Sequence, residues 1–145
     1  MQTERRIISE AEALQISPVT LAFVGDAVYS LFVRERLTLT VGGKVADLQR
    51  IASKVVSAKG QSEFLDKLLP MLNEEEEGVF RRAKNAKKAT KSKSASRLEY
   101  NRSTGFEAVM GYLYLTGRDA RIRELLSVCD EYERAESVKP FKPLH

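Results

Sequence analysis

The stretch from Val19 to Val33 constrains the fold most, because its fifteen residues contain one formal charge, Asp26. A surface helix keeps one face polar, whereas apolar side chains here fall at every helical angle. The stretch therefore predicts a central helix that is covered on most sides. A carboxylate in such a helix is costly unless a polar partner or a metal ion offsets its desolvation.

A second stretch, from Thr104 to Leu115, has the same character, with Glu107 as its single charge. A lone buried acid is usually a satisfied structural residue, so capping of Asp26 by a hydroxyl or an arginine stays open as an alternative. Two acids on two central helices indicate a shared site, because such helices pack together in a small domain. The chain has one His and one Cys, and two carboxylates with water suit a hard cation such as Mg²⁺.

Composition limits the class of protein. The 145 residues, 43% hydrophobic and 30% charged, fit one globular domain. No apolar run reaches the ~20 residues of a membrane helix, and the N-terminus lacks the apolar core of a signal peptide. The single Cys129 excludes an intrachain disulfide and is typical of a reducing cytoplasm. We therefore expect a cytoplasmic protein with no membrane partner.

Apolar residues recur at three- and four-residue steps along most of the chain, and no run alternates with the period of a strand. The expected fold is all-α. The pattern predicts helices over about 4–16 (Ile8, Ala11, Leu14 and Ile16 inward), 18–38, 44–58 (Val45, Leu48, Ile51, Ala52, Val55 and Val56 inward), 64–69, 74–84, 101–116 and a final amphipathic helix from about Ile122. We expect the tail, 136–145, to be disordered.

Asn73 is expected to cap the helix that starts with Glu74, Glu75, Glu76 and Glu77 and ends with basic residues. Acids first and bases last complement the helix macrodipole. The four acids are therefore better interpreted as helix-start residues than as a metal site.

Basic residues are concentrated between Arg81 and Arg102, where nine of them accompany a single acid, Glu99. This segment carries +8 and the rest of the chain −4, although the net charge is only +4. Because large apolar residues are missing between the lysines, the segment indicates nucleic acid rather than membrane as its partner. A merely solvated loop is the alternative. The candidate RNA-binding residues are Arg81, Arg82, Lys84, Lys87, Lys88, Lys91 and Lys93, around a basic loop at about 85–98 that we expect to be mobile.

A magnesium ion held by acids beside a basic loop is suited to phosphodiester hydrolysis. Two stretches also resemble a known family. Residues 21–28, LAFVGDAV, resemble the signature helix of ribonuclease III, and residues 106–113, FEAVMGYL, resemble the second acidic helix of that family. Residues 55–59 and 81–87 are similar to segments of the Mini-ribonuclease III branch, which has only the catalytic domain. The resemblance covers roughly 15–132.

The resemblance implies a homodimeric, all-α endoribonuclease that needs Mg²⁺ and cuts both strands of double-stranded RNA. Its substrate would be a precursor of large-subunit (23S) ribosomal RNA. The resemblance assigns Asp26 and Glu107 as the catalytic, metal-binding acids. Two further acids of the longer enzymes are replaced by Ala22 and Thr104, which leaves the number of metal ions open, and Asp47 is a further candidate carboxylate.

The implied layout is an N-terminal segment (1–14) and a catalytic domain (15–135) that lacks the double-stranded RNA-binding domain of longer relatives. RNA would then be recognised by shape, through its wide minor groove. A non-catalytic RNA-binding or ribosome-associated helical module is the alternative function. It is disfavoured by Asp26 and Glu107, because buried acids do not help a protein to bind a polyanion. A plain interaction protein would leave the +8 segment unexplained.

Overall fold

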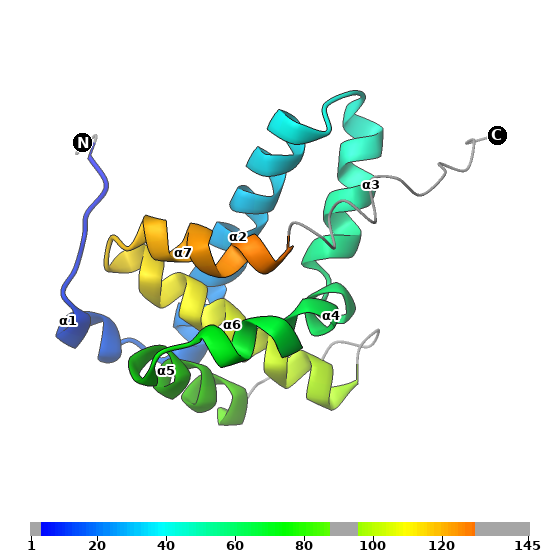
Figure 1. The fold of residues 1–145 in the computed structure, drawn as a ribbon. Helices are drawn as coiled ribbons and strands as arrows, with labels where there is room; N and C mark the ends of the chain where they lie inside the picture. Colours follow the sequence, from blue (N-terminus) through cyan, green and yellow to red (C-terminus); the bar gives the residue numbers. More distant parts are fainter. Residues whose placement is uncertain (1–3, 88–95, 130–145) are drawn as a thin grey trace.

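The computed structural model describes residues 4–87 and 96–129, which form helices and contain no strand. The expected all-α fold is confirmed (Figure 1). In chain order the elements are α1 (Glu10–Leu14), α2 (Pro18–Thr40), α3 (Val45–Val56), α4 (Ala58–Leu68), the 3-10 turn η1 (Leu69–Met71), α5 (Glu74–Asn85), α6 (Arg97–Leu115), α7 (Asp119–Leu126) and the 3-10 turn η2 (Ser127–Cys129). Within these residues no helix combines the length and apolarity needed to cross a membrane.

Helix α6 is the centre of the fold, and it packs against α2, α4, α5 and α7 (Figure 1). Three aromatic rings join α2, α4 and α6: the Tyr29 and Phe106 centroids lie 4.9 Å apart, and those of Phe64 and Phe106 lie 5.5 Å apart. Both contacts are edge-to-face, the arrangement that the ring quadrupoles favour. This cluster holds the three helices that carry the acid site.

The first helix is shorter than its pattern predicts. Helix α1 begins only at Glu10, because Ser9 and Glu12 form a reciprocal capping box at that point. Residues 5–9 instead run as a strap, and the Ile8 N–H donates to the Leu115 carbonyl at 2.9 Å. The predicted helix over 4–16 is therefore wrong at its start. Ala13 is the buried residue of α1, whereas Ala11 and Leu14 are exposed.

Helix α3 buries only part of its predicted apolar face. Ile51, Ala52 and Val55 are buried, but Val45 is 80% exposed. Val45 is the first residue of the helix and borders an open pocket that Leu37 and Thr38 of α2 also line. Its predicted inward position is wrong.

One face of α2 is left uncovered by the other helices that the structure describes. Phe23 is 79% exposed and Leu31 58%, and Val19 is also exposed. The helix packs on α6 through the opposite face, which includes Leu21, Gly25 and Val28. The prediction of a helix covered on most sides is therefore wrong for the described structure, because the other described helices reach only one side of α2.

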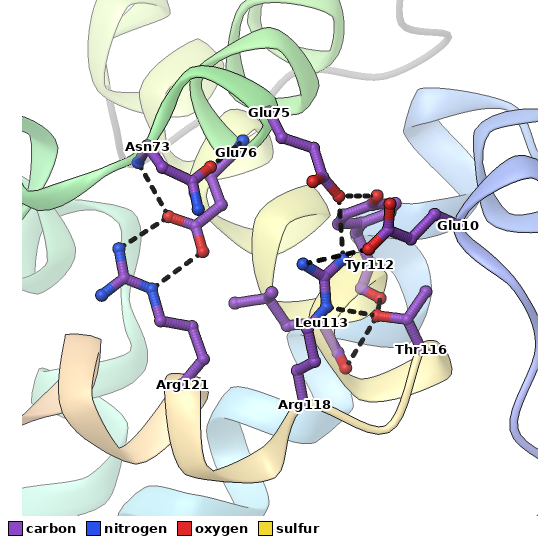
Figure 2. A network of polar contacts seen from close by, with 9 residues as sticks. All are labelled: Glu10, Asn73, Glu75, Glu76, Tyr112, Leu113, Thr116, Arg118 and Arg121. Carbon is purple, nitrogen blue, oxygen red and sulfur yellow. Dashed lines mark hydrogen bonds and ion pairs between the residues drawn. The ribbon is translucent and has the colours of Figure 1, made fainter.

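Helix α5 is held in place by two arginines at the start of α7 (Figure 2). Arg121 donates from Nε and Nη2 to the two carboxylate oxygens of the fully buried Glu76, at 2.9 and 2.8 Å. Arg118 donates to Glu75 at 2.9 Å, and the Tyr112 hydroxyl donates to the same carboxylate. The helix cap predicted for Asn73 is confirmed, and the structure shows it as a reciprocal capping box with Glu76. Glu75 and Glu76 thus begin the helix and also tie it to α6 and α7.

Candidate functional site

The acid site forms where α2 and α6 cross at glycines. A Cβ atom on Gly25 would stand 1.6 Å from the Glu107 carbonyl oxygen, and one on Gly111 would stand 2.0 Å from the Leu21 carbonyl oxygen. Only hydrogen atoms fit between the two backbones at this crossing. Asp26 follows Gly25 directly, so the close crossing brings its carboxylate to that of Glu107.

Glu107 has polar contacts from three helices. The Ser103 hydroxyl, one turn earlier on α6, donates to Glu107 Oε1 at 3.2 Å. Asp26 on α2 and Gln61 on α4 both lie within hydrogen-bonding reach of the same carboxyl group. Burial first, and then the hydrogen bond and negative charge of Asp26, raise the pKa of Glu107 to about 9, although Ser103 and Gln61 favour the charged form.

Asp26 lies in a different environment from the one predicted. It is exposed, whereas a covered position inside the apolar helix was expected. Asp26 is one residue beyond the face that α2 packs on α6, and it therefore borders solvent on one side and Glu107 on the other. It nevertheless contacts Glu107, so the structure brings together the two acids that the sequence singles out.

Few of the described side chains at the acid site could bind a metal ion. Ala22 is buried, and Thr104 is buried with its hydroxyl donating to the Tyr100 carbonyl at 2.9 Å. Residues 4–87 and 96–129 contain no group of three or more His, Cys, Asp or Glu side chains placed to hold a metal ion, so Asp47 does not complete such a group. Two adjacent carboxylates nevertheless fit Mg²⁺, which usually keeps several waters and takes one or two carboxylates from the protein. The raised pKa of Glu107 fits as well, because burial first, and then the hydrogen bond and negative charge of Asp26, disfavour the charged carboxylate, and a cation between the acids would offset these effects.

The candidate RNA-binding residues that the structure describes lie at the end of α5. Arg81, Arg82 and Lys87 are exposed and Lys84 is half-buried. Just beyond them is a pocket of about 670 Å³ between the end of α5 and the start of α6, lined by Lys84, Asn85, Ala86, Lys87, Arg97, Tyr100 and Asn101. Lys88, Lys91 and Lys93 lie outside the described residues, as does most of the predicted basic loop. The described part of the basic segment is a basic surface with a polar hollow.

Sequence patterns did not identify Gln61 or Ser103 as site residues. Gln61 precedes Phe64 by three positions and lies on the same, buried face of α4. A polar residue in the apolar stripe of an amphipathic helix was the available signal. Ser103 stands four residues before Glu107, one helical turn away. This spacing places the hydroxyl beside the acid on the same helix face, and it could have been recognised from the sequence.

Comparison with known proteins gives consistent matches. Residues 19–118 match the sequence model of a family described as "Ribonuclease III domain". A protein of Symbiobacterium thermophilum named Mini-ribonuclease 3 is 46% identical over 122 residues, which are 84% of this chain and 94% of that protein. The Mini-ribonuclease 3 of Streptococcus pneumoniae is 43% identical over 116 residues, 79% of this chain and 91% of the relative. The crystal structure of a Fusobacterium nucleatum protein superposes with a TM-score of 0.72 at 32% identity, covering 79% of this chain and 93% of that one.

Proposed function

The chain belongs to the ribonuclease III family, whose members are endoribonucleases of double-stranded RNA, and on that premise we propose a magnesium-dependent enzyme that cleaves a ribosomal RNA precursor. The observation that carries the proposal is the contact between Asp26 and Glu107 across the crossing of α2 and α6. A protein that only binds RNA has no use for adjacent carboxylates facing a polyanion. The same contact disfavours a non-catalytic RNA-binding module.

In the proposed mechanism Asp26 and Glu107 hold the cation. When bound, a divalent cation lowers the pKa of a water molecule and neutralises charge that develops on the phosphate. Ser103 keeps one oxygen of Glu107 oriented through its hydrogen bond. Because Glu107 has a raised pKa, it must release a proton when it binds a cation, and this couples cation affinity to pH.

In this proposal the RNA contacts come from the basic segment, through Arg81, Arg82, Lys84, Lys87, Lys88, Lys91 and Lys93. The described members of this set lie in the last turns of α5 or just after it, and Lys84 and Lys87 border the polar pocket before α6. Contacts of Lys and Arg with phosphates position RNA without reading its sequence. We therefore assign affinity and substrate orientation to this surface, and the chemical step to the acid pair.

A homodimer is part of the proposal. Phe23, Leu31 and Val19 form an exposed apolar face on α2, next to Asp26. A second copy related by a two-fold axis would cover this face with the same face of its own and bring two acid sites to one RNA duplex. Two symmetric sites are what cleavage of both strands requires. Sedimentation at micromolar concentration tests the dimer.

The cellular role rests on the relatives named Mini-ribonuclease 3 and on the family resemblance. We propose that the substrate is a precursor of large-subunit (23S) ribosomal RNA and that the enzyme works in the cytoplasm. The deciding experiment incubates the purified protein with double-stranded and single-stranded RNA, each with magnesium and with a chelator. Cleavage of the duplex only with magnesium supports the proposal. Duplex binding without cleavage under all conditions would favour the binding module instead.

A further inference from the structure

Gln61 is a buried polar residue that touches the acid site from a third helix. It is 1% exposed, at the first turn of α4. The turn lies tightly against the end of α3, because a Cβ atom on the preceding Gly60 would stand 2.0 Å from the Lys54 carbonyl oxygen. Gly60 therefore allows α4 to start directly over the last turn of α3, and this contact sets the position of Gln61.

The Gln61 amide is attached to a rigid part of the backbone. Its Nε2 donates to the Val56 carbonyl at 3.0 Å, and the Tyr29 hydroxyl donates to the adjacent Val55 carbonyl at 3.2 Å. Helix α3 ends at Val56, so its last carbonyl groups find no N–H donors within the helix and need hydrogen-bond donors from elsewhere. Gln61 and Tyr29 supply two of them, and the Gln61 side chain is thereby held in one orientation.

The same amide reaches the Glu107 carboxyl group. Gln61 thus links a fixed backbone carbonyl to the acid whose orientation the site depends on. Its Oε1 atom is buried and has no hydrogen-bond partner in the described part of the chain.

The chemistry of an amide suits a position beside two acids. A lysine or arginine there would neutralise Asp26 and Glu107 and would compete with a divalent cation. The neutral amide donates a hydrogen bond to Glu107 but leaves the negative charge of the pair available. Groups that orient metal ligands in this way typically change metal affinity or activity by about 10–100-fold when they are removed.

We propose that Gln61 is a positioning residue of the acid site, which holds the Glu107 carboxylate toward Asp26 so that the pair is ready to bind a divalent cation. The inference rests on the proposed function and adds a residue from α4 to it. Gln61 acts through Glu107 and is assigned no contact with RNA.

The test compares Gln61→Met with the wild-type protein. Methionine has a similar length and fills the buried space, but it donates no hydrogen bond. The matched control is Leu68→Met, a substitution at another buried position of α4, two turns further along. Three properties are measured: the thermal midpoint of unfolding, Mg²⁺ binding by calorimetry without RNA, and single-turnover cleavage of duplex RNA as a function of Mg²⁺ concentration.

We expect Gln61→Met to raise the Mg²⁺ dissociation constant about tenfold or more, with unchanged affinity for RNA in the absence of Mg²⁺. Cleavage should be slow at low Mg²⁺ and should recover as Mg²⁺ is raised. Leu68→Met should keep the wild-type Mg²⁺ affinity. If Gln61→Met lowers only the thermal midpoint and binds Mg²⁺ as the wild type does, Gln61 is a helix cap and the inference is overturned.

A second variant covers the case in which Gln61→Met does not fold. Gln61→Asn keeps the amide but withdraws it by one methylene, so it cannot reach both Val56 and Glu107. Weaker Mg²⁺ binding by this variant supports the inference, and wild-type binding contradicts it. A wild-type protein that binds no Mg²⁺ and cleaves no duplex RNA would contradict the proposed function itself. If the wild type is active and both Gln61 variants bind Mg²⁺ and cleave as it does, only the inference about Gln61 is overturned.

Discussion

The backbone of Gly25 lies directly against the backbone of Glu107, so closely that a Cβ atom on Gly25 would stand 1.6 Å from the Glu107 carbonyl oxygen. Residues on the two helices that are 82 positions apart in sequence are thereby fixed side by side. The position of Asp26 next to Glu107 follows from this contact, because Asp26 is the next residue along α2. The acid site is therefore a product of the helix crossing.

Gly25→Ala should force α2 and α6 apart. The added methyl group meets backbone atoms, which cannot rotate away, and we expect a loss of at least about 1–3 kcal/mol of folding free energy, with loss of cleavage. Urea unfolding measures the change. Gly78→Ala in α5 is the matched control, because the nearest atom to its Cβ is the end of the Arg82 side chain at 3.4 Å. Equal stability of the two variants would contradict the close crossing.

Asp26→Asn and Glu107→Gln should each reduce cleavage by about 100-fold or more, because each removes a charge that holds the cation while keeping the side chain's shape. The fold and the affinity for RNA should change little. Cleavage assays with circular dichroism check both points. A folded Asp26→Asn variant with normal activity would remove Asp26 from the catalytic role. Glu107→Gln should recover more activity than Asp26→Asn when Mg²⁺ is raised.

The stability of the metal-free protein should fall as pH rises. The pKa of Glu107 is about 9 in the folded chain against an ordinary 4.5, so the folded state binds the proton more tightly than the unfolded state. This contribution is complete below pH 4.5 and is lost as pH rises through about 9. Urea midpoints measured with a chelator from pH 5 to 9 test it, and Glu107→Gln should reduce the slope. An unchanged slope would assign the effect to other groups.

Arg121→Met should destabilise the protein by about 3–5 kcal/mol, because it leaves the buried Glu76 carboxylate without its charged partner. Thermal unfolding gives the size of the loss. Arg6→Met is the control, since Arg6 and Glu12 form an exposed ion pair whose removal should matter little. Adding Glu76→Gln to Arg121→Met should restore part of the stability. If the single and double variants were equally unstable, packing rather than the unpaired charge would be the cause.

Replacing Lys87, Lys88, Lys91 and Lys93 by Ser should weaken binding to duplex RNA and flatten its dependence on salt. Each lost phosphate contact should reduce the magnitude of the slope of log K against log salt by about 0.9, the value for B-DNA. Single-turnover cleavage at saturating RNA should change little. Binding measured at several salt concentrations is the test. Identical curves for variant and wild type would support a solvated loop with no role in RNA binding.

The sequence alone determined the helical class, and it singled out the two acids that the fold brings into contact. The all-round apolar runs of α2 and α6 each carried one charge, and the Asn73 capping signal and the acid-to-base order of α5 are contained within one helix. These features are local, because helix formation and capping depend on residues within a few positions of one another. Such patterns can therefore be interpreted without knowing what the helix packs against.

Only the tertiary structure decided how the site is assembled. Three contacts join residues that are far apart in the chain. They are the helix crossing at Gly25 and Gly111, the contact of Gln61 with Glu107, and the ion pair of Glu76 with Arg121. Apolarity on every face of α2 could not distinguish burial within one chain from burial against a second, so the exposure of Phe23 was not predicted. The physical reason is that periodicity reports which faces are apolar, whereas the packing of several helices determines what covers each face.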